Sequence, residues 1–309
     1  MKESIILISA ICGDIGSAAV RALKETGIRI IGYDMKLYSP VSDIVEKFYQ
    51  SPPAYHEESY IEFLKEIISK EGVNFFLPVS EPEIEVLNSR REDIERLGVK
   101  LLLNNRTILD NTLDKLKTAL YLEKLGIKVP KSVLLKDYDG SLGYPLIVKA
   151  RRGHGSKRIW RIEGENDLDY IRYKDDGSLI VQEYIGNDDE DYTTGVFSDG
   201  NLVTSITFKR KLGYGGLSAE VNLAEEPFLE KLARHIGREM KLIGSINIQS
   251  RRSGEIFIPY EINPRLSSTL PFRKKFGFDD VVWWVNVLIG KGYSYNKRYR
   301  SGRAIRCFS

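Results

Sequence analysis

Short apolar runs alternate with amphipathic stretches over the first third of the chain. The runs that we expect to form buried strands cover residues 5–9, 28–33, 74–78 and 100–103. The stretches with apolar residues at helical spacing cover residues 17–26, 60–70 and 83–97. Strands that alternate with helices are typical of a parallel sheet, so the pattern predicts a Rossmann-like parallel layer over residues 1–104.

The remaining two thirds of the chain predict a different architecture. An amphipathic helix is expected at residues 112–125, because Gly126 and Pro130 are signals that end a helix. Further strands are expected at residues 146–150, 157–161, 179–184, 192–197, 202–209, 245–250 and 256–262, and further helices at residues 167–172, 228–240 and 279–289. This α/β chain should therefore continue in a smaller lobe (105–184) and a larger lobe (185–309), both with antiparallel sheets.

Composition narrows the class of protein. Of the 309 residues, 42% are hydrophobic and 29% are charged, as in an ordinary globular protein. The net charge of +3 does not indicate nucleic-acid binding, and no apolar run is long enough to span a membrane. The two cysteines are far apart, which excludes a disulfide framework. We therefore expect a cytoplasmic protein without nucleic-acid or membrane partners. The basic C-terminal segment (291–306) is expected to be a solvated tail.

The turn Gly13-Asp14-Ile15-Gly16 follows the first strand and resembles part of a dinucleotide-binding fingerprint, with Asp34 at the end of the next strand. The full motif requires a glycine where this chain has Ile11, and a β-branched residue there obstructs the close turn under a pyrophosphate. The turn is therefore interpreted as a tight strand-to-helix connection, and an NAD-dependent oxidoreductase is the disfavoured alternative.

A basic loop follows the expected strand at residues 146–150. Lys149 lies at the end of that strand, and the loop after it contains Gly153, Gly155 and Ser156. Backbone N–H groups and cationic side chains of such a loop can converge on phosphates. A plain basic hairpin is the alternative interpretation, because the P-loop motif is absent.

Two oxygen-bearing side chains stand on the last expected strand. Glu261 and Asn263 are two residues apart and should share one face, while Ile256, Ile258, Tyr260 and Ile262 should pack the other. Carboxylate and amide oxygens are suited to magnesium. Arg265 follows directly and can bind a phosphate or a carboxylate. A solvated strand face is the alternative, disfavoured by the Pro264-Arg265 ending.

Together these motifs resemble the ATP-grasp superfamily, and within it the carbamoyl-phosphate-synthetase-like carboxylate–amine ligases with a single ATP-grasp unit, over about residues 1–290. The resemblance rests on the following segments: Asp114-Lys115, Lys149 with the loop Gly153–Ser156, Val181–Ile185, Glu190–Thr193, and Gln249 with Glu261–Arg265. No amidotransferase or carrier segment is expected.

The resemblance implies a role for each of these residues. ATP phosphates would be bound by Lys115, Lys149, Gly153, Gly155 and Ser156, and adenine by Glu183, Tyr184 and Ile185. Asp191, with Glu190 as the alternative, would hold the ribose. Magnesium, or manganese in its place, would be bound by Gln249, Glu261 and Asn263.

The function implied is a ligase that uses ATP to convert a carboxylate into an acyl phosphate and transfers the acyl group to an amine or a thiol. Arg265 and Arg210 are the expected catalytic contacts, with a structural role as the alternative for Arg210. The partners would be a small carboxylate and a small amine, and a homodimer is one option for the assembly. A non-catalytic ATP-binding regulatory or partner subunit is the alternative function.

The geometry of the last hairpin tests this metal set. Opposed residues of antiparallel strands share a face, so Gln249 can join Glu261 only if the numbers of paired residues have an even sum. A two-residue turn gives an odd sum. We therefore predict a loop of three or five residues, or an equivalent bulge, between Arg251 and Glu255, with Gly254 in the left-handed conformation.

Overall fold

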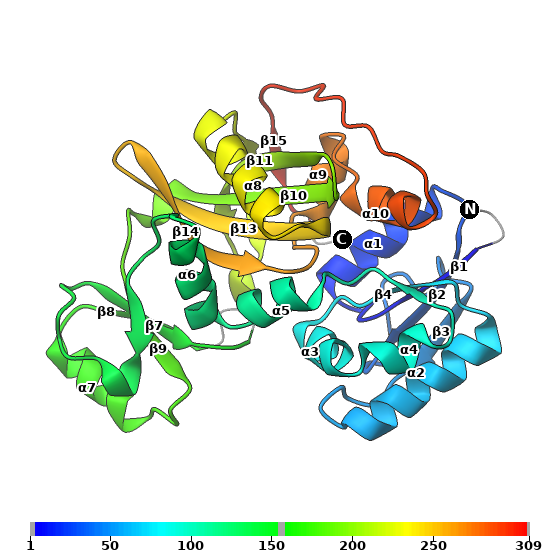
Figure 1. Ribbon diagram of the computed structural model, residues 1–309, viewed down its shortest axis with the longest axis horizontal. Coiled ribbons are helices and arrows are strands. Elements are labelled where there is room, and N and C mark those ends of the chain that lie inside the picture. Colours follow the sequence, from blue (N-terminus) through cyan, green and yellow to red (C-terminus); the bar gives the residue numbers. More distant parts are fainter. Residues whose placement is uncertain (1–3, 154–157, 308–309) are drawn as a thin grey trace.

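The computed structural model describes residues 4–153 and 158–307 (Figure 1). A parallel sheet and its helices lie at one end of the molecule, a larger sheet lies in the middle, and a small lobe projects at the other end. The predicted α/β class, with a parallel layer followed by antiparallel sheets, is confirmed.

The N-terminal layer is a parallel sheet in the order β3-β2-β1-β4-β5. Its strands are β1 (Ile5–Ile8), β2 (Arg29–Asp34), β3 (Lys47–Gln50), β4 (Phe75–Leu77) and β5 (Lys100–Leu101). Its helices are α1 (Asp14–Lys24), α2 (Glu57–Glu71), α3 (Glu81–Ser89) and α4 (Arg91–Glu95). The core on one face includes α1, and the core on the other includes α2, α3 and α4. The single helix predicted at 83–97 is in fact two, separated at Arg90.

Two short helices lead into the small lobe. They are α5 (Arg106–Thr112) and α6 (Lys115–Lys124), where one helix from Thr112 was predicted. The break occurs because the side chain of Asp114 caps α6, accepting hydrogen bonds from the amides of Leu116 and Lys117.

The small lobe is an antiparallel sheet in the order β6-β9-β7-β8, which packs against α7. Its elements are β6 (Ser132–Leu134), β7 (Leu146–Ala150), β8 (Ile159–Ile162), α7 (Glu165–Tyr173) and β9 (Leu179–Glu183). Short 3-10 turns occur at Leu135–Asp137, Asp188–Glu190 and Tyr214–Gly216.

The central sheet is antiparallel in the order β14-β13-β10-β11-β12-β15. Its strands are β10 (Asp191–Asp199), β11 (Val203–Leu212), β12 (Ser218–Leu223), β13 (Ile243–Ser253), β14 (Ile256–Asn263) and β15 (Arg303–Ile305). The helices of this part are α8 (Pro227–Glu239), α9 (Leu270–Lys275) and α10 (Asp280–Leu288). The apolar cluster on one face joins the sheet to α5, α6 and α8, whereas α9 and α10 contact α1 of the N-terminal layer.

The β13–β14 hairpin corrects the predicted loop length. Ser253 pairs with Ile256, so the loop has two residues, and Gly254 has the predicted positive φ of 62°. A bulge lies further along, because Gln249 pairs with Glu261 whereas Ser250 pairs with Pro259. Tyr260 is therefore the extra residue, and the even sum arises inside the strand rather than at the turn.

The C-terminal segment is not a solvated tail. β15 adds to the edge of the central sheet by pairing with β12, and Arg303 forms an ion pair with Glu220 at 2.9 Å. Arg306 donates to the backbone carbonyl of Ser218 at 3.0 Å and forms an ion pair with Asp14 at the start of α1. The segment therefore connects the central sheet to the N-terminal layer.

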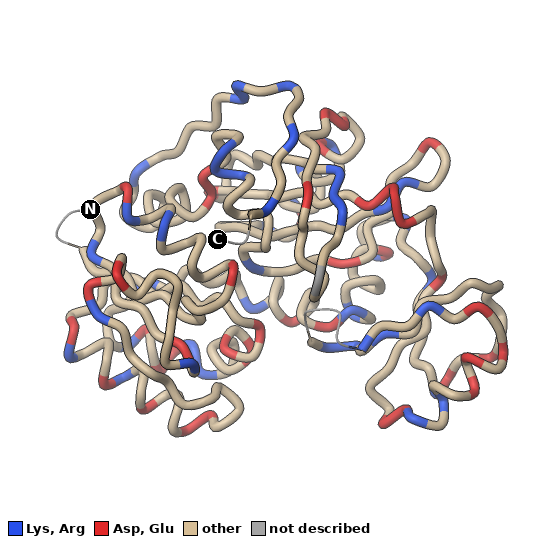
Figure 2. Tube along the Cα trace, turned by 180° about the vertical axis from the view of Figure 1, so that it is seen from behind, with Lys and Arg blue, Asp and Glu red and all other residues tan. Residues whose placement is uncertain are grey.

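Charges of both signs are interspersed along the whole trace (Figure 2). Neither the parallel layer nor either lobe, as far as the structure describes them, carries charges of only one sign. This agrees with the near balance of 46 Lys and Arg against 43 Asp and Glu. Among the described residues, no helix is long and apolar enough to cross a membrane.

A buried ion pair joins α9 to α10. Arg273 and Asp280 are both 0% exposed, and Arg273 Nη1 lies 2.7 Å from Asp280 Oδ2. Arg273 also donates to Thr269, Ser267 and Asn247. Gly195 lies beneath the guanidinium, where an added Cβ would be 2.4 Å from Arg273 Cζ. The guanidinium of Arg273 fits in this position only because residue 195 has no side chain.

We predict that Asp280→Ala lowers the free energy of unfolding by about 3–5 kcal/mol, since it leaves a buried guanidinium without its counter-ion. The control is Glu230→Ala, which breaks the half-exposed Arg234–Glu230 pair and should cost about 1 kcal/mol or less. Urea denaturation of both variants measures the difference. Equal unfolding midpoints would show that the buried pair does not stabilise the fold.

Candidate active site

One face of the central sheet gathers polar side chains from four neighbouring strands. Cross-strand pairing places Asp191 beside Arg251, Thr193 beside Gln249, and Gln249 beside Glu261. Residues that pair directly share a face, so these side chains line one surface. The opposite face carries Val196, Ile246, Ile248 and Ile262, which belong to an apolar cluster. The sheet therefore separates a polar site from a core.

A buried network forms the centre of this surface. Arg210 Nε donates to Asp191 Oδ1 at 2.6 Å, and Arg210 Nη2 donates to Gln249 Oε1 at 2.9 Å and to Tyr260 Oη at 3.1 Å. Tyr260 Oη in turn donates to Asp191 Oδ2 at 2.8 Å. Burial lowers the pKa of Arg210, but the neighbouring Tyr260 and Asp191 outweigh it and raise that pKa above its usual range. The guanidinium therefore remains charged.

The position of Tyr260 corrects one sequence-based prediction. It was expected to pack the apolar face with Ile262, but Ile262 pairs with Ile248 in the core while Tyr260 reaches Asp191 and Arg210. The bulge is the cause, because one extra residue reverses the direction of every side chain beyond it.

The ribose candidate Asp191 is 2% exposed, and both of its oxygens are engaged, with Arg210 and Tyr260. Glu190, the alternative, forms an ion pair with Lys209 at 2.5 Å. In the structure, Asp191 therefore lies in the site and holds Arg210, whereas Glu190 pairs with Lys209 instead.

The two predicted phosphate-binding lysines both lie near Glu261. Lys115 Nζ lies 4.0 Å from Glu261 Oε1 and donates to the backbone carbonyl of Gly153 at 2.8 Å. Lys149 Nζ donates to Gln182 Oε1 at 2.8 Å and lies 5.5 Å from the ring centre of Tyr260. Burial, together with the nearby cations Lys115 and Arg251, lowers the pKa of Lys149 to about 8, although Glu261 opposes this. The negative charge of a phosphate beside Lys149 would favour the ammonium form of this lysine and so raise its pKa again.

Two ion pairs hold the first residues of the loop after β7 in place. Arg151 Nε lies 2.7 Å from Asp114 Oδ2, and Arg152 Nη1 lies 3.4 Å from Glu85 Oε1 on α3. Gly153 has a φ of 105°, a conformation that favours glycine. Gly155 and Ser156 of the predicted flap lie outside the described residues. The described part of the loop therefore lies between α6 and α3.

The predicted metal donors share one face. Gln249 is directly opposite Glu261, and Asn247 is directly opposite Asn263. No three His, Cys, Asp or Glu side chains gather as a metal cluster in the described part of the chain, so a metal site here needs amide oxygens. Among the described residues, Gln249 Oε1 accepts one bond, from Arg210, and an amide oxygen has a second lone pair. The donor set therefore fits a hard cation such as magnesium.

The predicted adenine-binding segment lies beside this surface, at the end of β9. The amide of Glu183 donates to Lys131 in the sheet, and the carbonyl of Ile185 accepts from Arg251 Nη1 at 3.4 Å. The ring of Tyr184 lies 4.5 Å from the guanidinium carbon of Arg161 and 5.1 Å from that of Arg251. Gly186 must be small, since a Cβ there would meet the carbonyl of Arg252 at 2.3 Å. The segment is thus held against β13.

Arg265 lies at the junction with the N-terminal layer. Its Nη2 and Nε donate to the same oxygen of Glu81, at 2.6 and 3.2 Å, and its Nη1 donates to the carbonyl of Leu266. Glu81 is the first residue of α3, which belongs to the N-terminal layer. The expected anion-binding arginine therefore already has an intramolecular carboxylate partner.

Sequence reasoning missed Glu81, Gln182, Arg251 and Tyr260 as members of the site. Arg251 comes from the segment in which the hairpin loop was predicted, and Glu81 comes from the N-terminal layer. A signal for Tyr260 was present: Pro259 lacks an N–H group, and within a sheet proline is found on edge strands and at bulges. β14 is such an edge strand.

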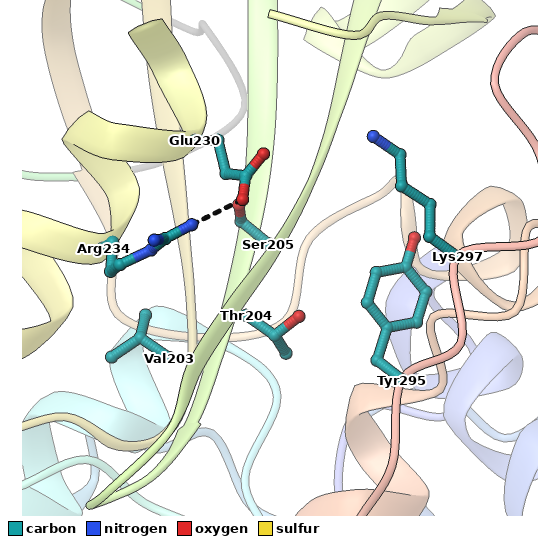
Figure 3. Close-up of a pocket in the computed structure, with 7 residues that line it drawn as sticks. All are labelled: Val203, Thr204, Ser205, Glu230, Arg234, Tyr295 and Lys297. Carbon is teal, nitrogen blue, oxygen red and sulfur yellow. Dashed lines mark hydrogen bonds and ion pairs between the residues drawn. The ribbon is translucent and has the colours of Figure 1, made fainter. Parts of the chain in front are cut away.

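A separate cavity of about 180 Å³ lies between β11, α8 and the C-terminal segment (Figure 3). It is lined by Val203, Thr204, Ser205, Glu230, Arg234, Tyr295 and Lys297. Its ionic groups are already paired, Arg234 with Glu230 and Lys297 with Glu225. Because it adjoins the end of β11 remote from Arg210, it is not part of the polar site.

Comparisons with known proteins match both parts of the chain. Residues 6–102 match the PylC-like N-terminal domain, and residues 112–269 match the ATP-grasp domain. The large chain of carbamoyl phosphate synthase from Saccharolobus islandicus is 25% identical over 268 residues, which are 80% of this chain and 25% of that protein. This chain therefore spans about a quarter of the length of that relative.

Solved structures share the fold. The biotin carboxylase domain of Hydrogenobacter thermophilus 2-oxoglutarate carboxylase, a dimer in complex with MgADP, ADP and bicarbonate, has a TM-score of 0.76 and 18% identity, covering 95% of this chain and 71% of that one. N5-carboxyaminoimidazole synthetase from Staphylococcus aureus, complexed with ADP, has a TM-score of 0.77 and 16% identity, covering 95% and 79%.

The ATP-grasp match, residues 112–269, covers half of the chain and includes most of the polar site. The two lysines, the segment Glu183–Ile185 and the Gln249–Glu261–Asn263 face all lie inside it. The chain belongs to the ATP-grasp family.

Proposed function

We propose that this chain is an ATP- and magnesium-dependent ligase that activates a carboxylate as an acyl phosphate and transfers the acyl group to an amine. The observation that carries the proposal is the oxygen face of Gln249, Glu261 and Asn263, which stands beside Lys115 and Lys149. Gln249, Glu261 and Asn263 would hold a magnesium ion there, which would supply positive charge against the ATP phosphates. Manganese prefers similar oxygen donors, so we expect it to substitute.

The chain's own residues would position the nucleotide. Lys149 and Lys115 would contact its phosphates, and the segment Glu183–Ile185 would hold adenine by its backbone. Arg251 and Tyr184 would form one side of that pocket, because they are already stacked at 5.1 Å. Asp191 would act through Arg210, holding the guanidinium beside Gln249. Positioning and electrostatics dominate phosphoryl transfer, which suits a site of this composition.

The reaction would have two steps. A carboxylate oxygen of the substrate bonds to the γ-phosphorus of ATP while the bond from that phosphorus to the bridging oxygen breaks, so ADP leaves and an acyl phosphate remains. The amine nitrogen then bonds to the acyl carbon, phosphate leaves with the electrons of the carbon–oxygen bond, and the nitrogen loses a proton. Arg265 would face the reacting carboxylate, and the loop after β7 would exclude water.

Acyl-phosphate formation can be tested with hydroxylamine as a surrogate amine. We expect ADP release with Mg-ATP and one or more members of a carboxylate panel, together with an equal yield of hydroxamate from the same donor. Omission of magnesium should abolish both products. Nucleotide binding without ADP release for every donor would instead favour the non-catalytic ATP-binding subunit.

We predict that Glu261→Gln lowers ADP release by about 100-fold and leaves the fold intact, because it removes the negative charge of the metal site but keeps its shape. The matched control is Glu255→Gln, an exposed carboxylate on the same hairpin, which should behave as wild type. A rate close to wild type at limiting magnesium would show that Glu261 does not hold the ion.

We predict that Lys149→Met weakens ATP binding about 10- to 100-fold at pH 7, the usual effect of losing a charge-assisted hydrogen bond. The wild-type affinity should also fall as the pH rises through 8, because the pKa of Lys149 is about 8 and the ammonium form binds phosphate. The variant should lack this pH dependence, and Lys117→Met, exposed on α6, should retain it. Calorimetric titration measures both, and an unchanged dissociation constant would move the phosphate site elsewhere.

A further inference from the structure

Arg306 follows β15 and reaches into the junction between the central sheet and the N-terminal layer. Its side chain is only 9% exposed, and 292 positions separate it from its ion-pair partner Asp14. Figure 1 shows this end of the C-terminal segment beside α1. A buried guanidinium is stable only where its N–H groups find acceptors, so the acceptors of Arg306 indicate what the residue does.

The guanidinium of Arg306 contacts three separate parts of the fold. Its Nη1 forms the ion pair with Asp14 at the start of α1, its Nε donates to the carbonyl of Ser218 in β12 at 3.0 Å, and its Nη2 donates to the carbonyl of Ser268. The guanidinium carbon also lies 5.3 Å from the ring centre of Phe272 on α9. Arginine can serve three acceptors in this way because its N–H groups lie in one plane and point in fixed, divergent directions.

The contact with Ser268 is a contact with the turn that carries Arg265. This turn starts at Pro264, and Arg265 lies three residues before Ser268. Asn104 donates to the carbonyl of Pro264 at 3.0 Å and so fixes the start of the turn. Arg306 fixes the same turn beyond Arg265. Because Arg265 lies between these two hydrogen bonds, both limit how far its backbone can move.

Arg306 also fixes the start of β12. The amide of Ser218 lies 3.5 Å from its acceptor Ser268 Oγ, so the strand and the turn are joined directly as well as through Arg306. Ser218 pairs with Leu212, two residues after Arg210 of the polar site. Both pieces of backbone that Arg306 holds therefore lead into the polar site.

Attachment of β15 to the sheet does not explain these contacts. β15 is already joined to β12 by backbone pairing, and the ion pair between Arg303 and Glu220 adds a side-chain link. The Arg306 side chain instead reaches beyond β12 to the turn and to α1. Its contacts thus fix the relative positions of three elements rather than one strand.

We propose that Arg306 is a positioning residue for the activation of the carboxylate. It holds the turn with Arg265 and the start of β12 against the N-terminal layer, and it acts through Arg265 rather than by touching the substrate. Its effect is confined to the carboxylate end of the cleft, since Lys149 and β9 of the proposed nucleotide site belong to the small lobe. The proposal rests on the proposed ligase function, which assigns Arg265 to the carboxylate.

The test uses the hydroxylamine assay at saturating Mg-ATP with the carboxylate of the panel that gives most hydroxamate. We expect Arg306→Gln to lower kcat/KM for this carboxylate about 10- to 100-fold, the scale of loss when a reacting group is misplaced by about 1 Å. The dissociation constant of MgADP, measured by calorimetry, should not change. Arg306→Lys keeps the charge but cannot serve all three acceptors, so it should recover part of the activity.

The matched control is Arg303→Gln, which removes the half-exposed ion pair of the same strand and should behave as wild type. A purely structural role of Arg306 predicts a lower urea midpoint for Arg306→Gln with an unchanged kcat/KM. That result would overturn the positioning role, as would an equal loss of carboxylate kcat/KM and MgADP affinity.

Amide hydrogen exchange in the presence of MgADP separates this proposal from the proposed function, because it requires no turnover. We expect residues 266–273 and 218–220 to exchange faster in Arg306→Gln than in the wild type and Arg303→Gln, with residues 179–185 unchanged. Unchanged exchange in the turn would overturn the positioning role and leave the ligase function standing. Faster exchange in the turn, without hydroxamate from the wild type and any donor, would support the hold of Arg306 on the turn and overturn the ligase function.

Discussion

The bulge at Tyr260 is the constraint on which the polar site depends. In a regular hairpin with the same two-residue loop, Gln249 would face Tyr260, and Glu261 would face Ile248. Glu261 and Asn263 would then be directed at the apolar cluster that contains Ile248. Burial of two unpaired polar groups there is far more costly than one unpaired residue in an edge strand. The bulge resolves the conflict, because Ile262 joins the core while Glu261 and Asn263 face the site.

The same bulge links the proposed metal donors to the proposed nucleotide pocket. Tyr260 leaves the apolar face and bonds to Asp191 and Arg210, and Arg210 in turn holds Gln249. Lys149 lies near the tyrosine ring from the small lobe. Side chains from both lobes therefore meet around one residue, so a change in the register of β14 would disturb the proposed phosphate, ribose and metal positions together.

Behind this site, a buried network fixes the turn that carries Arg265. Asn247, opposite Asn263, accepts from Thr193, Ser267 and Arg273, and Arg273 is neutralised by Asp280. Asn104, from the connection after the parallel layer, donates to the carbonyls of Ser245 and Pro264. These bonds hold the segment after β14 between the two domains. The position of Arg265 relative to Glu81 is thus set by this buried network as well as by the Glu81–Arg265 ion pair itself.

The sequence by itself determined most of the elements in their order, the ATP-grasp family and the residue types of the candidate site, but it did not predict β3, β6, β12, β15 or α9. Strand and helix periodicity are local properties, and motifs such as Glu261-Ile262-Asn263-Pro264-Arg265 are read directly from the chain. Only the tertiary structure decided where the register of the β13–β14 hairpin shifts, what Tyr260 contacts, and which carboxylate reaches Arg265. Register depends on burial across strands, and the Glu81–Arg265 pair depends on how two domains pack. Neither is specified by neighbours in the sequence, which is why local reasoning placed the bulge at the turn and left Glu81 without a role.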